Sequence, residues 1–208
     1  IYPPRLAMEQ CSSEATACYK ARLVSRESAD LAGLADSTSL AIKTSLASAI
    51  RPARPSDPAS PSRLTDLTGG FGVDCTMMAA GFDEVTYVER NPTLCATTAA
   101  NFVTLGLMHV RTVQDDACNV LEHLPMQDWL FIDPARRDTA GRKMVSLADC
   151  EPDVIRLEPL LLAKGRHVMV KCSPMLDISK ALEELCHVKE VHVVAVANEC
   201  KELDVVME

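Results

Sequence analysis

After residue 62, short apolar runs alternate with stretches long enough to form helices, and this alternation limits the folds that the chain can adopt. The candidate strands are Arg63–Leu67, Glu84–Val88, His109–Val113, Trp129–Ile132, His167–Lys171, Val191–Ala197 and Leu203–Met207. The candidate helices are Asp74–Ala80, Pro92–Leu105, Ala117–Leu124, Asp149–Leu162 and Ser179–Leu185. Strands that alternate with helices predict an α/β fold, a doubly wound and mostly parallel seven-stranded sheet with helices on both faces.

The last two candidate strands are separated only by the five residues NECKE. A crossover between parallel strands needs about a dozen residues or more. We therefore expect these two strands to form a terminal antiparallel hairpin, with Asn198 at positive φ in its turn.

Residues 1–62 have a different character. The stretch SSEATACYKARLV predicts a helix with Ser12 or Ser13 as its N-cap. The positions expected on one face of this helix are Ala17, Cys18, Ala21 and Val24. The segment RPARPSDPASPSR carries four prolines, which predicts an exposed linker. We therefore divide the chain into an N-terminal helical segment with a Pro-rich linker, residues 1–62, and an α/β domain, residues 63–208.

The amino-acid composition indicates which classes of partner the protein binds and in which cellular compartment it lies. The 208 residues are 48% hydrophobic, enough to bury a real core, and the net charge of −8 disfavours non-specific binding to polyanions. No apolar run approaches the roughly 18 residues of a membrane span. Nine cysteines without a Cys-x-x-Cys pair predict reduced thiols in a cytoplasmic protein. Because the chain begins at Ile1 instead of Met, we expect it to be a piece of a longer protein.

The segment DLTGGFGVD, residues 66–74, places three glycines directly after the first candidate strand. In doubly wound sheets, ligands bind outside the carboxyl ends of the strands, and glycine lets them approach the backbone closely. The segment matches neither the dinucleotide pattern G-x-G-x-x-G nor a phosphate loop. Asp66 and Asp74 would repel a pyrophosphate. We therefore predict a positively charged nucleoside cofactor without phosphate, bound by Asp66, Thr68, Gly69, Gly70 and Gly72.

Acidic residues also follow the next two candidate strands. Glu89, in VTYVERNP, can accept two hydrogen bonds from a ribose diol, although a surface charge that closes the strand is the alternative. Arg90 beside it is assigned to the same cofactor site. Asp116, in QDDA, can accept a hydrogen bond from an adenine amino group, with Ala117 against the base.

Together these features resemble the class I S-adenosylmethionine-dependent methyltransferases. Asp66, Gly70 and Gly72 match the Asp-x-Gly-x-Gly-x-Gly loop of those enzymes, and Thr68 replaces the first glycine. The resemblance covers residues 63–208 and implies a Rossmann-like fold with S-adenosylmethionine as cofactor. Some of these enzymes place a segment before the domain that folds over the methionine end of the cofactor. Ser12 and Ser13 would lie in that segment, and a simple helix cap is the alternative.

A closer resemblance runs almost from end to end of the chain. The segments MEQCSSEATACYKA, DLTGGFGVD, YVERNP, FIDPARRD, DCEPDV, VKCSPMLDI and NECKEL are similar to a bacterial family of uncharacterised methyltransferases that carry a THUMP-like domain. This implies an RNA substrate, tRNA or rRNA, and an RNA-binding portion downstream of Glu208. A looser likeness, through the glycine loop and ERNP, is to the small-subunit ribosomal RNA guanine-N2 methyltransferases.

The segment FIDPARRD, residues 131–138, follows the fourth candidate strand. Amine-methylating relatives carry Asp/Asn-Pro-Pro-aromatic there, and its carboxylate or amide and its first proline carbonyl accept hydrogen bonds from the target amine. Asp133 and Pro134 match and become the predicted catalytic residues, whereas Ala135 and Arg136 depart from the pattern. The predicted substrate-binding residues are Arg136, by stacking on a base, Arg137, by holding a phosphate, and Ser173, in the turn after the fifth strand.

Three hypotheses remain for the function. The first is methylation of a base amine of RNA, which needs orientation more than acid–base catalysis, so we expect no metal and no catalytic triad. The second is a non-catalytic module that keeps the fold, favoured by Ala135 and Arg136. The third, a nucleotide-dependent oxidoreductase, is disfavoured by the missing dinucleotide pattern and by Asp133-Pro134.

Overall fold

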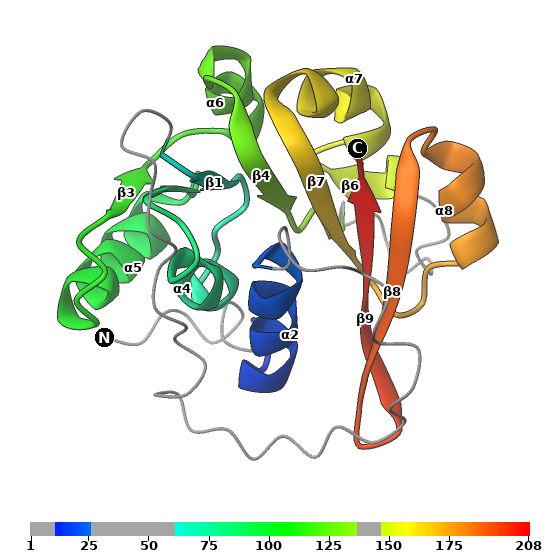
Figure 1. Cartoon of the computed structure of the whole chain (residues 1–208), viewed down its shortest axis with the longest axis horizontal. Helices are drawn as coiled ribbons and strands as arrows, with labels where there is room; N and C mark the ends of the chain where they lie inside the picture. The colour runs from blue at the N-terminus through cyan, green and yellow to red at the C-terminus, as the bar shows by residue number, and fades with distance from the viewer. Residues whose placement is uncertain (1–10, 26–60, 137–146) are drawn as a thin grey trace.

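The structure is a computed structural model, and it describes residues 11–25, 61–136 and 147–208 (Figure 1). A seven-stranded sheet forms its centre. The strands of that sheet are β1 (Arg63–Asp66), β2 (Glu84–Val88), β3 (Val110–Val113), β4 (Gln127–Ile132), β7 (Gly165–Cys172), β8 (Val188–Val196) and β9 (Glu199–Met207). The helices are α2 (Glu14–Val24), α4 (Val73–Ala79), α5 (Pro92–Thr104), α6 (Ala117–His123), α7 (Val154–Lys164) and α8 (Ile178–Glu184).

The strand order is β3-β2-β1-β4-β7-β9-β8. Neighbouring strands from β3 to β7 run parallel, whereas β9 is antiparallel to both β7 and β8. The order reverses between β1 and β4, so their carboxyl ends form the switch point at which such sheets bind ligands. The predicted doubly wound sheet with a terminal hairpin is therefore confirmed.

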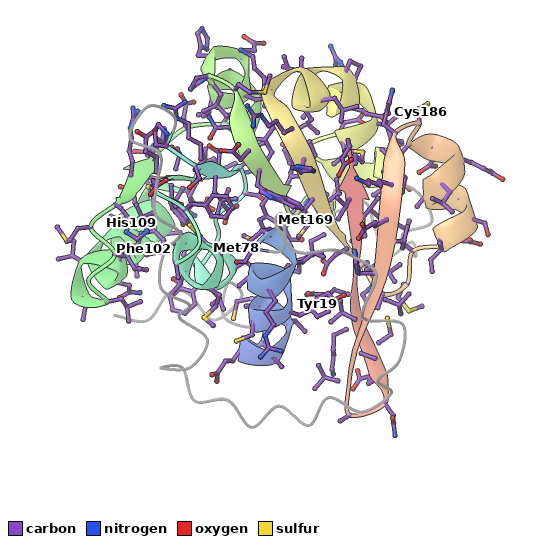
Figure 2. All side chains as sticks on the ribbon, in the orientation of Figure 1. Tyr19, Met78, Phe102, His109, Met169 and Cys186 are labelled. Atoms are coloured by element: carbon purple, nitrogen blue, oxygen red, sulfur yellow. The ribbon has the colours of Figure 1, made fainter. Side chains whose placement is uncertain are left out.

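Each face of the sheet packs against its own set of helices. Leu130 and Ile132 of β4, with Val168 and Val170 of β7, belong to an apolar core that also takes in Leu121 of α6, Leu161 of α7 and Ala181 of α8. The alternate positions of the same strands, Phe131 and Met169, face Leu23 of α2, Met78 of α4 and Phe102 of α5 (Figure 2). This alternation is the period of two that places successive side chains on opposite faces.

Several helices begin at a side chain that accepts hydrogen bonds from the first turn. Asn91 caps α5 and precedes Pro92, which suits the first helical position because it has no N–H to leave unpaired. Asp153 caps α7, and Asp177 caps α8. Ser13 caps α2 through the backbone N of Thr16, which confirms one of the two predicted caps.

The hairpin is longer than the sequence predicted. Strands β8 and β9 take in most of the NECKE segment, and only Ala197 and Asn198 form the turn. Both residues have positive φ, 52° and 62°, as a two-residue turn of type I′ requires. The prediction for Asn198 is therefore confirmed, and the predicted strand ends are corrected.

The region before α7 differs from prediction. The helix begins at Val154 and not at Asp149, and Asp153 is its cap, with Oδ1 accepting a hydrogen bond from the backbone N of Arg156. Residues 147–149 form a 3₁₀ turn instead, and β6 (Cys150–Glu151) pairs with β5 (Ala135–Arg136) as a small antiparallel sheet that the sequence analysis missed.

The predicted face of α2 is partly wrong. Ala17 and Val24 are buried, but Lys20 is also fully buried, and Cys18 and Ala21 are only half-buried. Most of the predicted Pro-rich linker lies outside the described residues, and the division at residue 62 stays a prediction. No helix in the described ranges combines the length and apolarity needed to cross a bilayer.

Candidate functional site

The glycine loop follows β1 and passes very close to β2. The backbone N of Gly69 donates to the carbonyl of Val88 over 2.8 Å, and a Cβ on Gly69 would lie 2.0 Å from the Tyr87 ring. Only glycine fits there without moving the ring. Gly70 has a φ of +53°, and the only heavy atom near its Cβ position is the Thr68 carbonyl oxygen at 3.8 Å. The loop therefore has space at the Cβ position of Gly70, while the Gly70 carbonyl accepts hydrogen bonds from the hydroxyls of Tyr87 and Thr98.

Thr68 stands where the related loops have their first glycine, and its hydroxyl has a structural role. Oγ1 accepts a hydrogen bond of 2.6 Å from the backbone N of Asp133, just after β4. The backbone N of Thr68 donates to Oδ1 of Asp66 over 3.1 Å. A glycine at this position would remove this side-chain link and leave the backbone bond from Leu67 N to the Phe131 carbonyl, 2.9 Å, as a connection to the end of β4.

Glu89 lies beside the loop, at the end of β2. Its Oε2 accepts from the backbone N of Gly70 over 3.0 Å, and its Oε1 accepts from the backbone N of Asn91 over 2.7 Å. A carboxylate offers about four lone-pair positions, so these two bonds leave room for two hydroxyl donors. The structure thus brings Glu89 and the loop together, and ribose binding stays a prediction.

Asp116 is the N-cap of α6, and its Oδ1 accepts from the backbone N of Cys118 over 2.9 Å. The Asp116 carboxylate also makes a hydrogen bond with the side chain of Cys118, and adenine binding stays a prediction. Ala117 is 6% exposed and presents little surface to a base. The sequence analysis weighed Asp116 for the base alone and missed its role as a cap.

The two aspartates that flank the loop differ in their surroundings. Asp66 is 1% exposed, and burial raises its pKa well above the ordinary value, although the N–H of Thr68 opposes that rise. Asp66 therefore supports the loop from inside the protein. Asp74 lies in the first turn of α4, and its Oδ2 accepts from the hydroxyl of Ser12 over 2.7 Å. Ser12 thus brings the segment before α2 to the loop.

Asp133 directly follows β4 and pairs with Lys171 on the neighbouring parallel strand. Oδ2 of Asp133 lies 2.6 Å from Nζ of Lys171. The pairing of Ile132 with Val170 places the two residues next to each other across the strands. Burial raises the pKa of Asp133, and the adjacent Lys171 opposes the rise. No partner of Oδ1 lies in the described parts of the chain, and Pro134 follows directly.

Further charged side chains continue from Lys171 toward α2, and we call Lys20, Asp74, Lys171, Glu202 and Asp204 the buried charge cluster. Nζ of Lys20 contacts Oε1 of Glu202 and lies 3.1 Å from Oδ1 of Asp74. Burial raises the pKa of Asp204 to about 7, and neither of its oxygens has a hydrogen-bond partner in the described residues. Nearby, the Tyr19 hydroxyl meets Nδ1 of His192 at 2.8 Å (Figure 2).

The remaining predicted site residues lie around this centre. Nη1 of Arg90 is 2.8 Å from Oε1 of Glu151, which joins the end of β2 to β6. Ser173 lies in the turn after β7, where its Oγ accepts from the backbone N of Met175 over 3.3 Å. The backbone of Arg136 lies in β5, paired with Cys150. Arg137 lies outside the described residues.

A cavity of about 280 Å³ lies between α4 and α5, behind the loop. Its lining includes Phe71, Met77, Phe102 and Leu105. Neither Glu89 nor Asp133 lines it, so this apolar cavity is separate from the candidate site. Within the described residues, no group of three or more His, Cys, Asp and Glu side chains is arranged to hold a metal ion.

Solved structures with a similar fold identify the fold class of this chain. The chain is 30% identical to a candidate methyltransferase from Porphyromonas gingivalis W83, with a TM-score of 0.74 over 99% of this chain and 43% of that one. An rRNA methylase from Streptococcus thermophilus matches 71% of this chain and 87% of its own length, at 13% identity and a TM-score of 0.54. The chain has the class I methyltransferase fold.

A third structure, a candidate methyltransferase from Streptococcus mutans in complex with SAH, matches 70% of this chain and 87% of its own, at 11% identity and a TM-score of 0.51. At these identities the two streptococcal proteins show the fold alone. The present chain spans less than half the length of the Porphyromonas protein. No protein-family model matches the sequence, and no curated protein matches it.

Proposed function

We propose that the protein is an S-adenosylmethionine-dependent methyltransferase that methylates a base amine of RNA. The observation that carries this proposal is the arrangement of Asp133. Its backbone is tied to the glycine loop through Thr68, one carboxylate oxygen is held by Lys171, and the other is free. An acceptor fixed beside the cofactor loop is what an amine needs in order to be aimed at a methyl group.

The residues at the switch point fit the proposed cofactor. Gly70 leaves space at its Cβ position, and the carboxylate of Glu89 lies against its N–H as an acceptor for two ribose hydroxyls. The carboxylate of Asp116 would accept from the adenine amino group. S-adenosylmethionine would supply a methyl group on a sulfonium, which leaves as a neutral thioether when the methyl is transferred.

The proposed role of Asp133 is to orient the target and to remove charge from it. Oδ1 accepts a hydrogen bond from the amine and turns the nitrogen lone pair out of conjugation with the ring. As the nitrogen–carbon bond forms, the nitrogen becomes positive and releases a proton to Oδ1, and from there to water. Water can reach this group because the side chain of Asp133 is 36% exposed. Orientation of this kind contributes up to about 7–11 kcal/mol in well-aligned reactions.

The proposed substrate is RNA, supported by the rRNA methylase fold neighbour and by the resemblance of the sequence to RNA-modifying families. The net charge of −8 is unsuited to holding a polyanion by itself. We therefore propose that tight RNA binding needs a THUMP-like portion outside residues 1–208. The length of the Porphyromonas protein, of which this chain covers 43%, is consistent with such a portion.

Asp133 provides the test of this function. In the full-length protein, Asp133→Ala should lower methyl transfer to total RNA from a deletion strain by orders of magnitude, because its hydrogen bond is strongest in the transition state. Asp133→Asn should be milder, since an amide oxygen still accepts a hydrogen bond. Calorimetry should find S-adenosylmethionine affinity nearly unchanged in both.

Asp153→Asn is the matched control, because asparagine caps a helix about as well as aspartate and α7 begins away from the site. Equal turnover per folded molecule in the wild type and in both Asp133 variants would contradict the mechanism. Absence of methyl transfer in the wild type, with the cofactor bound, would favour a non-catalytic module.

A further inference from the structure

We infer that Lys171 is a positioning residue for the proposed methyl transfer, which keeps the Asp133 carboxylate charged and turned so that Oδ1 remains free for the amine. This inference rests on the proposed function of Asp133. It adds a residue on β7 that the sequence analysis placed at the end of a strand and gave no role.

The ammonium group of Lys171 lies closest to the carboxylate of Asp133. Nζ lies 2.6 Å from Oδ2 of Asp133 and 3.7 Å from Oδ2 of Asp74. The side chain of Lys171 is 11% exposed, whereas that of Asp133 is 36% exposed. The lysine therefore lies on the protein side of the carboxylate. A substrate that approached from solvent would meet Asp133, and Lys171 would act through it.

The surroundings explain why Asp133 needs a cation. The charged groups around the Asp133–Lys171 pair come from four elements: Lys20 of α2, Asp66 of β1, Asp74 of α4, and Glu202 and Asp204 of β9. Four of these five are acidic. Without Lys171, the partly buried carboxyl of Asp133 would keep Asp74 as an acidic neighbour and lose its nearest cation. A carboxyl in such a site takes up a proton, and a protonated oxygen donates a hydrogen bond where the amine requires an acceptor.

Lys171 itself is not suited to remove the proton. Burial lowers its pKa, but Asp133 and Asp74 together raise it above the ordinary lysine value. The ammonium group therefore stays charged at neutral pH and has no lone pair to offer. Its contribution is to hold Oδ2 and to oppose the rise that burial imposes on the pKa of Asp133.

A purely structural ion pair makes a different prediction from a positioning residue. Loss of a structural pair would lower the stability of the protein and leave the pH dependence of each folded molecule unchanged. Loss of a positioning cation would move the acid limb of the rate profile toward higher pH. An opposite charge within hydrogen-bonding distance shifts a carboxyl pKa by about 1–3 units.

The first test is the pH–rate profile of the full-length protein with Lys171→Met, and with Lys171→Gln as a second neutral variant in case the first does not fold. We expect the acid limb of kcat to move up by about 1–3 pH units, a loss of roughly tenfold per unit on that limb. Lys171→Arg keeps the charge and should keep the limb in place. Lys189→Met is the matched control, because Lys189 pairs with Glu208 at the exposed edge of β8.

The second test measures the pKa of Asp133 directly and does not depend on methyl transfer. Carbon-13 NMR of labelled aspartate would follow the ionisation of Asp133, assigned by its loss in Asp133→Asn. The pKa of Asp133 should rise by about 1–3 units in Lys171→Met and stay in place in Lys171→Arg and Lys189→Met. An unchanged pKa in Lys171→Met would overturn the inference. If the pKa rises but the wild type transfers no methyl group, the electrostatic pair stands and the proposed function fails.

Discussion

The two faces of the central sheet bury side chains of different chemistry. On the face covered by α6, α7 and α8, the core consists mainly of apolar residues such as Leu161 and Val170, and the buried Glu158 of α7 accepts hydrogen bonds from the backbone N of Cys186 and His187. On the opposite face, the apolar cluster around Phe131 gives way to the buried charge cluster where α2 crosses β7 and β9. Both faces come from the same strands, since residues that are adjacent in sequence point to opposite sides.

Apolar burial on both faces would be enough to stabilise the sheet, so the buried charges on one face point to a requirement of the candidate site. An apolar interior would stabilise the sheet as well on one face as on the other, and buried ion pairs are often no better than hydrophobic residues of similar volume. The charges lie next to the end of β4, where the glycine loop and Asp133 meet. We interpret the polar face as the place where local stability is given up for the chemistry of the site.

The largest expected effect on this comparison comes from Lys20. Lys20→Ala should lower the free energy of unfolding by about 3–5 kcal/mol, because Glu202 and Asp74 would stay buried without their cation. Urea denaturation followed by circular dichroism measures the change. The double variant Lys20→Met with Glu202→Gln should recover part of the loss.

Leu161→Ala is the matched change on the apolar face, with an expected loss of about 2–5 kcal/mol from the cavity that it leaves. For Leu161→Ala, we expect no second substitution that restores stability as Glu202→Gln does for the Lys20 variant. If Lys20→Ala were no more harmful than the exposed Lys189→Ala, the charge cluster would not hold α2 in place.

The next effect depends on pH and concerns Asp204. Its pKa is about 7 in the folded protein, against 3.8 ordinarily, so the folded state keeps a proton that the unfolded chain has lost. The stability from this proton is fully present below about pH 4 and is lost as the pH rises to about 7, by up to about 4 kcal/mol. Asp204→Asn removes the titration.

The free energy of unfolding of the wild type should therefore fall, relative to that of Asp204→Asn, as the pH rises from 4 to 8. Thermal melts of both proteins across this range measure the difference, and titrating groups common to both cancel. Asp128→Asn, at the half-buried second residue of β4, serves as the control. Parallel curves for the wild type and Asp204→Asn would mean that the carboxyl is already ionised at pH 5.

The smallest expected effect on stability comes from Glu89, where the cost should fall on binding. Glu89→Ala should weaken S-adenosylmethionine binding by about 1.5–3 kcal/mol for each hydroxyl that loses a charged acceptor. Glu84→Gln, on the same strand but paired with Arg63 at the exposed end, should leave affinity unchanged. Calorimetry that finds equal affinity in Glu89→Ala and the wild type would remove Glu89 from the cofactor site.

Local signals were enough to predict most of the fold. Strand β2 was predicted with its observed bounds, because Val85, Tyr87 and Val88 are apolar and Asn91-Pro92 marks the start of the next helix. The hairpin followed from the short connection between its strands. The start of α7 was missed because both Asp149 and Asp153 are candidate caps, and only the pairing of β5 with β6 decides between them.

The site was predictable where it depends on one segment and not where it depends on partners far away in sequence. The glycine loop, Glu89 and Asp133 were predicted from their positions at strand ends, and their roles in binding and catalysis stay predictions. Lys20 looked like the solvent side of a helix, since its partner Glu202 is 182 residues away. Lys171 looked like the polar end of a strand until the register of β4 and β7 placed it beside Asp133.

The hydrogen bond from the backbone N of Asp133 to the Thr68 hydroxyl connects the proposed cofactor site with the proposed substrate site. The glycine loop would hold the cofactor, and Asp133 would receive the amine. The two are joined by one hydrogen bond of 2.6 Å, from the backbone N of Asp133 to Oγ1 of Thr68. Any shift of the loop on occupancy is transmitted to the main chain at Asp133, 65 residues further along the sequence. A single threonine hydroxyl thus couples the position of the glycine loop to the main chain at Asp133.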